Sequence, residues 1–263
     1  MRTFSALLAF TLSLGALRAE DFPTVMTVRG KEIYSQDFSQ PLPKYTGKPI
    51  GYATGFQGWL IHGTGPESRG GQWKQIDGRF QGHENPQVKH PSTASFGLEF
   101  KNIIVQCQVR FEDVELDKDP AHGFKSRYLQ LRTTNDRTYL CSLSISPGAF
   151  GLIKDDNDFE GPDQRVQLAS GKAPVKVGEW TTVLLEILGD EMTATVNGVT
   201  LTGQNAAVAQ TKKSFMFVIG TEGSVRDLHI WEASAHPDWP MNRAVLAAKQ
   251  TPLAPAKKPA AKK

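Results

Sequence analysis

The sequence predicts an all-β protein built as a two-sheet antiparallel sandwich. Roughly ten short runs alternate apolar and polar residues, and most are bounded by Gly, Pro, Asn or Asp. The composition, 39% apolar and 22% charged, is that of a globular domain with enough apolar residues for a core. The one helical pattern, PMNRAVLAAKQ, is short and comes late in the chain. Many short strands with few helices are typical of a β-sandwich.

The first 19 residues are predicted to be a secretory signal peptide. Arg2 supplies an early positive charge, FSALLAFTLSLGAL is an uncharged apolar run, and Ala19 is a small residue suited to cleavage before Glu20. The apolar run has 14 residues, which is short for a membrane span. We therefore expect a secreted or periplasmic protein whose mature chain has no transmembrane segment.

The remaining chain divides into one sandwich domain, residues 20–248, and a tail, residues 249–263. The tail is rich in Lys, Pro and Ala, with five lysines and no acid, and this composition predicts disorder. Without the leader's two arginines and these lysines, the formal charge of +3 becomes −4 for the body. That balance argues against a nucleic-acid partner. The tail is either a solvated end or a contact for anionic envelope polymers.

Two alternating runs carry unusual polar residues on one side. In IIVQCQVRF the outward residues are polar while the others are apolar, and YLQLRT repeats the pattern. If these strands pair, their polar side chains form one face. Planar groups with several donors suit sugar hydroxyls, and an aromatic ring can stack on a pyranose. The predicted substrate-binding residues on this face are Gln106, Gln108, Arg110, Tyr128, Gln130 and Arg132. The alternative is a polar face covered by a loop or open to water.

Loops supply the other candidate site residues. Trp59 lies among glycines in a long loop region, residues 39–72, and is either a binding platform or a plug at one end of the sandwich. His83 and Glu84 directly follow the Asp77-Gly78 hairpin and could act together as acid and base. The alternative for this pair is an exposed polar loop.

Cysteines and clustered acids leave further alternatives open. Cys107 and Cys141 are expected on apolar strand faces, either as a disulfide or as two buried thiols. Asp155, Asp156 and Asp158 belong to an acidic loop that is either solvated or able to bind a structural calcium ion. No other cofactor is expected.

Three motifs together resemble a known family. They are DFSQ with GQWKQIDGRFQG, then VGEWTTVLLEILGDEMTATVNGVTL, then SFMFVIGTEGSVRDLHIWEA. In this order they are similar to the 3-keto-disaccharide hydrolase domain family, within the concanavalin A-like lectin/glucanase superfamily. The resemblance covers residues 33 to 234 and implies a jelly-roll sandwich, with the His83–Glu84 loop near the mouth of a sugar groove.

The resemblance implies an exported carbohydrate-active protein that hydrolyses a glycosidic bond. The strand RTYLCSLSIS, where such proteins often carry acids, has none here. Two alternatives therefore stay open: a non-catalytic carbohydrate-binding module, and an envelope protein-interaction domain.

Overall fold

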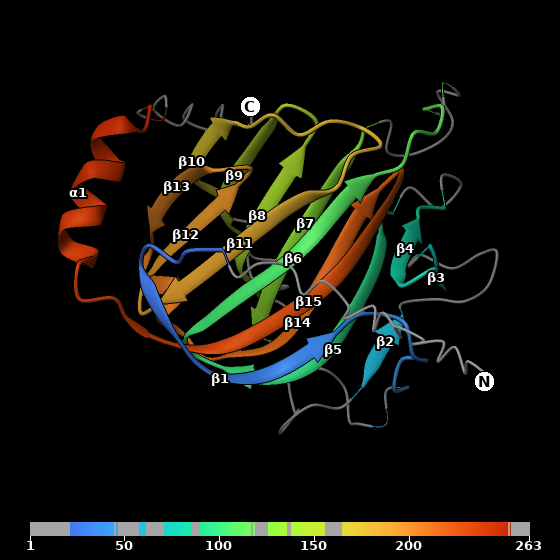
Figure 1. Cartoon of the computed structure of the whole chain (residues 1–263), viewed down its shortest axis with the longest axis horizontal. Helices are drawn as coiled ribbons and strands as arrows, with labels where there is room; N and C mark the ends of the chain where they lie inside the picture. The colour runs from blue at the N-terminus through green and yellow to red at the C-terminus, as the bar shows by residue number, and fades with distance from the viewer. Residues whose placement is uncertain are drawn as a thin grey trace, which may run out of the picture.

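The computed structural model describes residues 22–44, 46, 58–61, 71–85, 90–116, 118, 126–135, 138–155, 165–251 and 253. They form two packed β-sheets with one helix at the side (Figure 1). The predicted all-β, two-sheet antiparallel sandwich is confirmed. No helix among these residues is long and apolar enough to cross a membrane.

Sheet A has eight strands. Seven follow the order β13 (Val199–Gln204), β12 (Glu191–Val196), β11 (Thr181–Leu188), β6 (Ile103–Phe111), β15 (Glu222–Ala235), β4 (Arg79–His83) and β3 (Gln72–Ile76). The eighth, β1 (Thr27–Gln36), pairs with the second half of β15, because β4 pairs only with its first four residues. The strand β15 thus pairs with two strands, β4 and β1, one after the other along the same edge.

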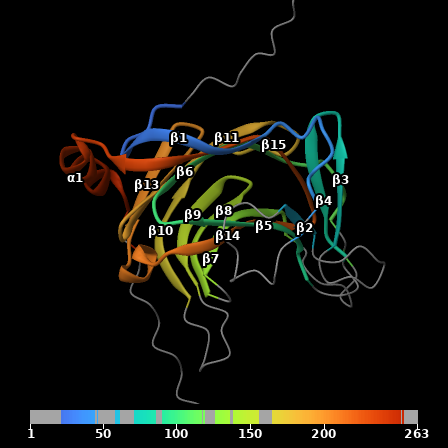
Figure 2. The same cartoon turned by 90° about the horizontal axis from the view of Figure 1, so that it is seen from below.

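Sheet B has seven strands. Their order is β10 (Val166–Lys172), β9 (Ala149–Lys154), β8 (Thr138–Ser146), β7 (Tyr128–Asn135), β14 (Lys212–Gly220), β5 (Ser92–Phe100) and β2 (Trp59–Ile61). Figure 2 shows sheet A arching over sheet B, with β13 and β3 at its two ends. The strand β2 lies inside residues 39–72, so that region is not a loop throughout.

Tight turns form where the sequence predicts them. Asn197 and Gly198, with φ of 45° and 78°, join β12 to β13, and Asp77 and Gly78, with φ of 49° and 68°, join β3 to β4. Both central residues of such a turn need positive φ, which Asn, Asp and Gly tolerate.

The core lies between the sheets and is filled by the inward residues of each alternating run. Leu129 and Leu131 of β7 face Val105 and Val109 of β6 across this interior, and all four are buried. Cys107 on β6 and Cys141 on β8 are buried free thiols on opposing sheets. Burial raises the pKa of both thiols, since an apolar interior disfavours the thiolate.

The N-terminal segment is held on the outer face of sheet A by one buried carboxylate. Glu186 of β11 is 1% exposed and accepts hydrogen bonds from the backbone N–H groups of Val25, Met26 and Thr27 at 3.1, 3.0 and 2.8 Å. The hydroxyls of Thr27 and Thr193 donate to it at 2.7 and 3.0 Å. We call these hydrogen bonds the Glu186 clamp. Phe22 packs on a small apolar cluster nearby, which comprises Ile104, Leu184 and Trp231.

The predicted helix, α1 (Trp239–Lys249), lies beside the edge strand β13 (Figure 1). Beyond it, the Gln250 side chain donates to the carbonyl of Thr202 and accepts from its N–H, both at 2.9 Å. The amide therefore pairs with the strand edge as another strand would. The ordered domain thus includes Lys249 and Gln250, which the sequence analysis assigned to the tail.

Candidate functional site

The outer face of sheet B carries a line of polar side chains that are joined by hydrogen bonds. On β7, Tyr128, Gln130 and Arg132 point away from the core because Leu129 and Leu131 point into it. The Nε of Arg132 donates to the Oε1 of Gln130 at 2.6 Å. The Nε2 of Gln130 donates to the Oγ of Ser144 on β8 at 3.2 Å. Gln130 therefore holds both neighbours in place.

Several side chains on this face are buried. On β14, next to β7, Met216 is 9% and Val218 1% exposed, although both lie on the outer side of the sheet. Ser142 of β8, opposite Arg132, is 2% exposed, and its hydroxyl has no hydrogen-bond partner. A buried hydroxyl without a partner is uncommon, because losing its bonds to water is costly. The outer side of sheet B thus has buried apolar side chains and the buried Ser142 hydroxyl next to the Arg132–Gln130–Ser144 hydrogen bonds.

Tyr128 lies at one end of the line, over Gly220 of β14. A Cβ added at Gly220 would come within 2.2 Å of the Tyr128 ring, so a side chain there would displace the tyrosine. Burial raises the pKa of Tyr128 to about 12; the charge of Arg132 lowers it and the charge of Glu84 raises it. Its hydroxyl therefore stays protonated, and able to donate, at physiological pH.

Glu84 comes to this same end from sheet A. It follows β4, is 4% exposed, and its backbone N–H donates to the carbonyl of Thr221 at 2.9 Å. Thr221, with φ of 67°, is the single residue between β14 in sheet B and β15 in sheet A. The sharp passage between the sheets thus brings Glu84 within electrostatic range of Tyr128.

The other half of the predicted polar face lies elsewhere, which is a correction. Gln106, Gln108 and Arg110 are on the outer face of β6 in sheet A, whereas β7 belongs to sheet B. Alternation within each strand is as predicted, but the chain changes sheet between residues 111 and 128. The two sets therefore face opposite sides of the sandwich and cannot form one groove.

The three β6 residues also have structural partners. Gln106 is 2% exposed and accepts from the N–H of Phe22 at 3.1 Å and from Arg29 at 2.9 Å. Gln108 accepts from the Nε of Arg226 at 2.7 Å. Arg110 binds both oxygens of Glu112, at 2.8 and 2.9 Å.

Trp59 also differs from the binding role predicted for it. Trp59 is 4% exposed and packs against Phe80, Phe96 and Phe217, so it plugs the core as the alternative held. Its Nε1 donates to the hydroxyl of Tyr34 at 2.7 Å.

His83 and Glu84 are not a pair, because successive residues leave a strand on opposite sides. The Nδ1 of His83 lies 3.0 Å from Glu222 on the outer face of sheet A. The two predicted catalytic residues therefore belong to different faces of the sandwich.

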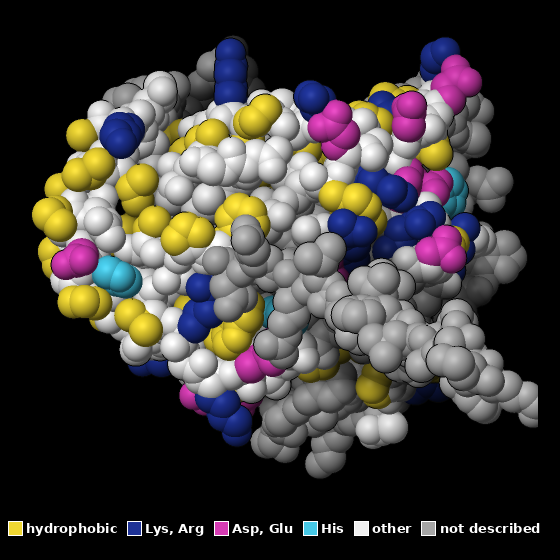
Figure 3. All heavy atoms as spheres, in the orientation of Figure 1, with side chains coloured by type: hydrophobic (Ala, Val, Ile, Leu, Met, Phe, Trp, Pro, Cys, Tyr) yellow, Lys and Arg dark blue, Asp and Glu magenta, His cyan; other side chains and the backbone are white. Residues whose placement is uncertain are grey.

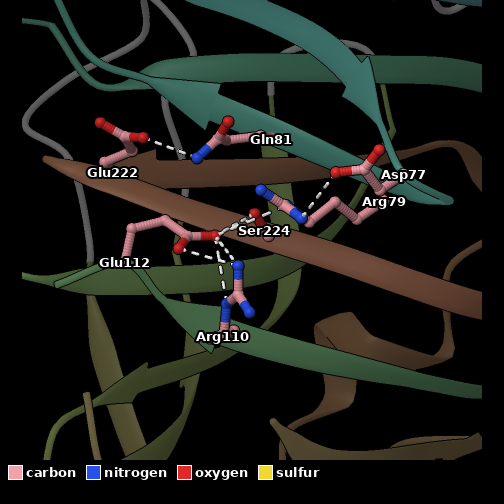
Figure 4. A network of polar contacts seen from close by, with 7 residues as sticks. All are labelled: Asp77, Arg79, Gln81, Arg110, Glu112, Glu222 and Ser224. Atoms are coloured by element: carbon pink, nitrogen blue, oxygen red, sulfur yellow. Dashed lines mark hydrogen bonds and ion pairs between the residues drawn. The ribbon is translucent and has the colours of Figure 1, made fainter. Parts of the chain in front are cut away.

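Two acids that the sequence analysis did not select, Glu112 and Glu222, belong to a network of polar contacts on sheet A (Figure 4). Glu112 accepts from Ser224 at 2.5 Å and from Arg110, and Arg79 lies 3.9 Å from it. Glu222 accepts from Gln81 at 2.6 Å. The i, i+2 spacing of Arg110 and Glu112 at the end of a strand was the available signal, since it places them on one face. Their donors satisfy both carboxylates, which is typical of a structural network.

The predicted calcium site stays a prediction. Asp155 directly follows β9, but Asp156 and Asp158 lie outside the described residues. Among the residues that are described, no three His, Cys, Asp or Glu side chains gather in a way that could hold a metal ion.

Solved structures share this fold. A carbohydrate binding module, CBM66, from Bacillus subtilis matches with a TM-score of 0.50 at 10% identity, over 66% of this chain and 95% of that one. A Bacillus subtilis protein of unknown function with a galectin-like fold matches with a TM-score of 0.49 at 11% identity, over 80% and 100%. LamAcat from Zobellia galactanivorans gives 0.46 at 10%, over 76% and 97%.

At such low identity these matches show the fold alone. The predicted jelly-roll sandwich is confirmed as a fold, whereas membership in the concanavalin A-like superfamily stays a prediction. No family model matches the sequence, and no curated protein matches it, so membership in the 3-keto-disaccharide hydrolase family stays a prediction.

Proposed function

We propose that this protein binds a carbohydrate on the outer face of sheet B, through Tyr128, Gln130 and Arg132. The observation that carries the proposal is the Arg132–Gln130–Ser144 chain of hydrogen bonds on the outer side of sheet B. Side chains fixed before a ligand arrives lose little entropy on binding, so each bond to a sugar hydroxyl contributes more to affinity.

The chemistry of this face suits a sugar. Gln and Arg present several donors in a plane, and Ser and Tyr hydroxyls both donate and accept. The predicted leader makes a secreted or periplasmic setting part of the proposal, where extracellular glycans are the available ligands.

Hydrolysis of a bound glycan is a second candidate, favoured by Glu84. A carboxyl group almost excluded from water, within electrostatic range of the Tyr128 hydroxyl, is a candidate for proton transfer. Glycosidases commonly use two carboxyl groups. The hydrolase reading therefore needs a second acid besides Glu84.

A glycan array probed with the mature protein tests the leading proposal. Arg132→Ala and Gln130→Ala should each weaken binding of a captured glycan about tenfold or more, as expected for loss of a charged or paired hydrogen bond. Arg226→Ala, on the outer face of sheet A, is the matched control and should leave binding unchanged. An array without signal, or equal losses in all three variants, would reject the site.

Glu84→Gln separates the two candidates. If the protein is a hydrolase, this variant should keep the glycan bound while product release, measured by chromatography, falls at least about a hundredfold. If the wild-type protein forms no product from any glycan that it binds on the array, hydrolysis is rejected and binding stays as the proposed function.

A further inference from the structure

The strand β13 has an outer edge whose backbone groups point away from its sheet. It is the last strand of sheet A, and β12 is its one partner among the described strands. The pair that flanks a two-residue turn, here Val196 and Val199, is hydrogen-bonded, and such pairs alternate along a hairpin with pairs that are not. Thr200, Thr202 and Gln204 belong to the second kind, so their N–H and C=O groups face the outer edge.

Gln250 shows what kind of group this edge binds. Its side-chain amide donates to the carbonyl of Thr202 and accepts from the N–H of the same residue, both at 2.9 Å. A primary amide presents the same donor and acceptor as a peptide group, so Gln250 takes the place of one unit of an added strand. On either side of it, no described residue hydrogen-bonds to the backbone of Thr200 or Gln204 from beyond the edge.

Open space lies along the edge on both sides of the Gln250 amide. One cavity, of about 410 Å³, is lined by residues 198–201 of the hairpin, and another, of about 360 Å³, by residues 202–204. The remaining walls come from β10 and α1, and Figure 2 shows these two elements beside β13 at one end of the sandwich. From Thr200 to Gln204 the edge is about 13 Å long, which corresponds to about five extended residues.

The helical wall of this space is held in place by polar contacts. The indole N–H of Trp239 donates to Glu191 at 2.6 Å, and the guanidinium of Arg243 donates to Gln204 at 2.8 Å. A chain that enters beside β13 therefore meets a fixed surface. Only the side chain of Gln250 has to turn away for the whole edge to become accessible.

The two cavities differ in chemistry. The lining of the larger one includes Lys172 and Lys249 and no acidic residue, so it suits an acidic side chain. Figure 3 shows a basic side chain at the upper left, where Figure 1 has the end of α1, with no acidic side chain next to it. The one acid and the one arginine of the smaller cavity pair with each other at 2.8 Å. Its apolar lining, which suits an apolar side chain, consists of Leu168, Ala247 and Leu253.

We propose that the outer edge of β13 binds an extended peptide segment of another protein as an added strand. The segment would displace the Gln250 amide and pair with the backbone of Thr200, Thr202 and Gln204. It would carry an acidic residue toward the lysines of the larger cavity and an apolar residue toward the smaller one. This inference is independent of the proposed sugar site.

A second copy of this chain fits the edge less well than a single segment. The helix α1 stands beside β13, so a second sheet that approached edge to edge would bring its own helix against it (Figure 1). Symmetric pairing would also place the lysines of both copies near one another, and like charges repel.

Panning a displayed library of random seven-residue peptides on the mature protein tests the proposal. Enriched peptides should be rich in β-branched residues, which suit strands, and should contain Asp or Glu. The most enriched peptide, synthesised with a fluorescent label, then gives a dissociation constant by anisotropy. Hydrogen exchange of the Thr200 and Gln204 amides should slow when this peptide binds.

Two substitutions test pairing with the backbone. Thr200→Pro removes one outward N–H at an edge position, where proline is tolerated, and should weaken peptide binding about tenfold. Gln250→Ala vacates the edge and should tighten binding by up to about tenfold, because the peptide no longer displaces two hydrogen bonds. Circular dichroism melts establish that each variant is folded.

A charge reversal tests the larger cavity. Lys172→Glu with Lys249→Glu should weaken binding at least tenfold, and a peptide whose acidic residue is replaced with lysine should restore it. The matched control, Lys31→Glu with Lys74→Glu, changes two exposed lysines on β1 and β3 and should leave binding unchanged.

Four results would overturn the proposal. The first is a library that yields no enriched peptide. The second is peptide binding that neither Thr200→Pro nor Gln250→Ala changes. The third is peptide binding that Arg132→Ala abolishes, which would place the peptide on the outer face of sheet B. The fourth is a dimer in light scattering that Thr200→Pro dissociates, which would give the edge to a second copy.

Discussion

Replacing Glu186 with glutamine should release the N-terminal segment from sheet A. Both oxygens of Glu186 accept hydrogen bonds from backbone N–H groups: one from Val25, the other from Met26 and Thr27. An amide has only one acceptor oxygen. Its NH₂ group can turn toward the Thr193 hydroxyl, but it then faces the N–H of Val25 and repels it.

The expected cost is about 3 kcal/mol of unfolding free energy. Hydrogen bonds to a charged group contribute about 1.5–3 kcal/mol each, and a buried donor left without a partner costs about 1–3 kcal/mol. The substitution weakens the bonds to the retained oxygen and removes the one to Val25. For a domain of this size, about 3 kcal/mol corresponds to a melting temperature lower by about 6–12 °C.

Urea unfolding measures this change directly, with Glu232→Gln as the matched control. Glu232 is exposed on β15, and its substitution should shift stability by less than about 0.5 kcal/mol. Hydrogen exchange of the Val25 to Thr27 amides should accelerate in Glu186→Gln alone. A loss under about 1 kcal/mol, or unchanged exchange of these amides, would refute the clamp.

Three further outcomes are expected. The pKa of Tyr128 is raised from 10.0 to about 12, so its contribution to stability is present below pH 10 and lost as the pH rises through about 12; Tyr128→Phe should lack this loss in denaturation series across that range. Deleting residues 254–263 should move the melting temperature by no more than about 2 °C, whereas Gln250→Ala should cost about 1–2 kcal/mol through its two bonds to β13. Mass spectrometry of the exported protein should find Glu20 as the first residue, and retention of Met1 would contradict the predicted signal peptide.

Local patterns predicted the strands and their faces well. The outward positions of β6 and β7 follow from period-two alternation, and the Asp-Gly and Asn-Gly pairs correctly indicated the hairpins. These features depend on neighbours a few residues away, which the sequence contains explicitly.

The sheet to which each strand belongs could not be predicted in the same way. The consecutive strands β6 and β7 have the same alternation of apolar and polar residues, yet β6 belongs to sheet A and β7 to sheet B. Arg110 and Arg132 therefore face opposite directions. Nothing in their alternation distinguishes pairing within a sheet from passage between sheets.

Long-range contacts account for the remaining differences. Glu186 is buried by backbone N–H groups that lie about 160 positions earlier in the chain, and its own strand does not reveal them. The glycines around Trp59 are equally compatible with a surface platform and with a buried residue. Its burial depends on contacts with Phe80, Phe96 and Phe217, which are distant in the sequence. Glu84 comes within electrostatic range of Tyr128 where Thr221 carries the chain from one sheet to the other.

The most direct test of the central claim is a crystal structure of the protein with an oligosaccharide captured on the array. The account predicts sugar density on the outer face of sheet B, with hydroxyl oxygens within hydrogen-bond distance of Gln130 and Arg132 and a ring near Tyr128. Density on the outer face of sheet A, or at an end of the sandwich away from these residues, would contradict it.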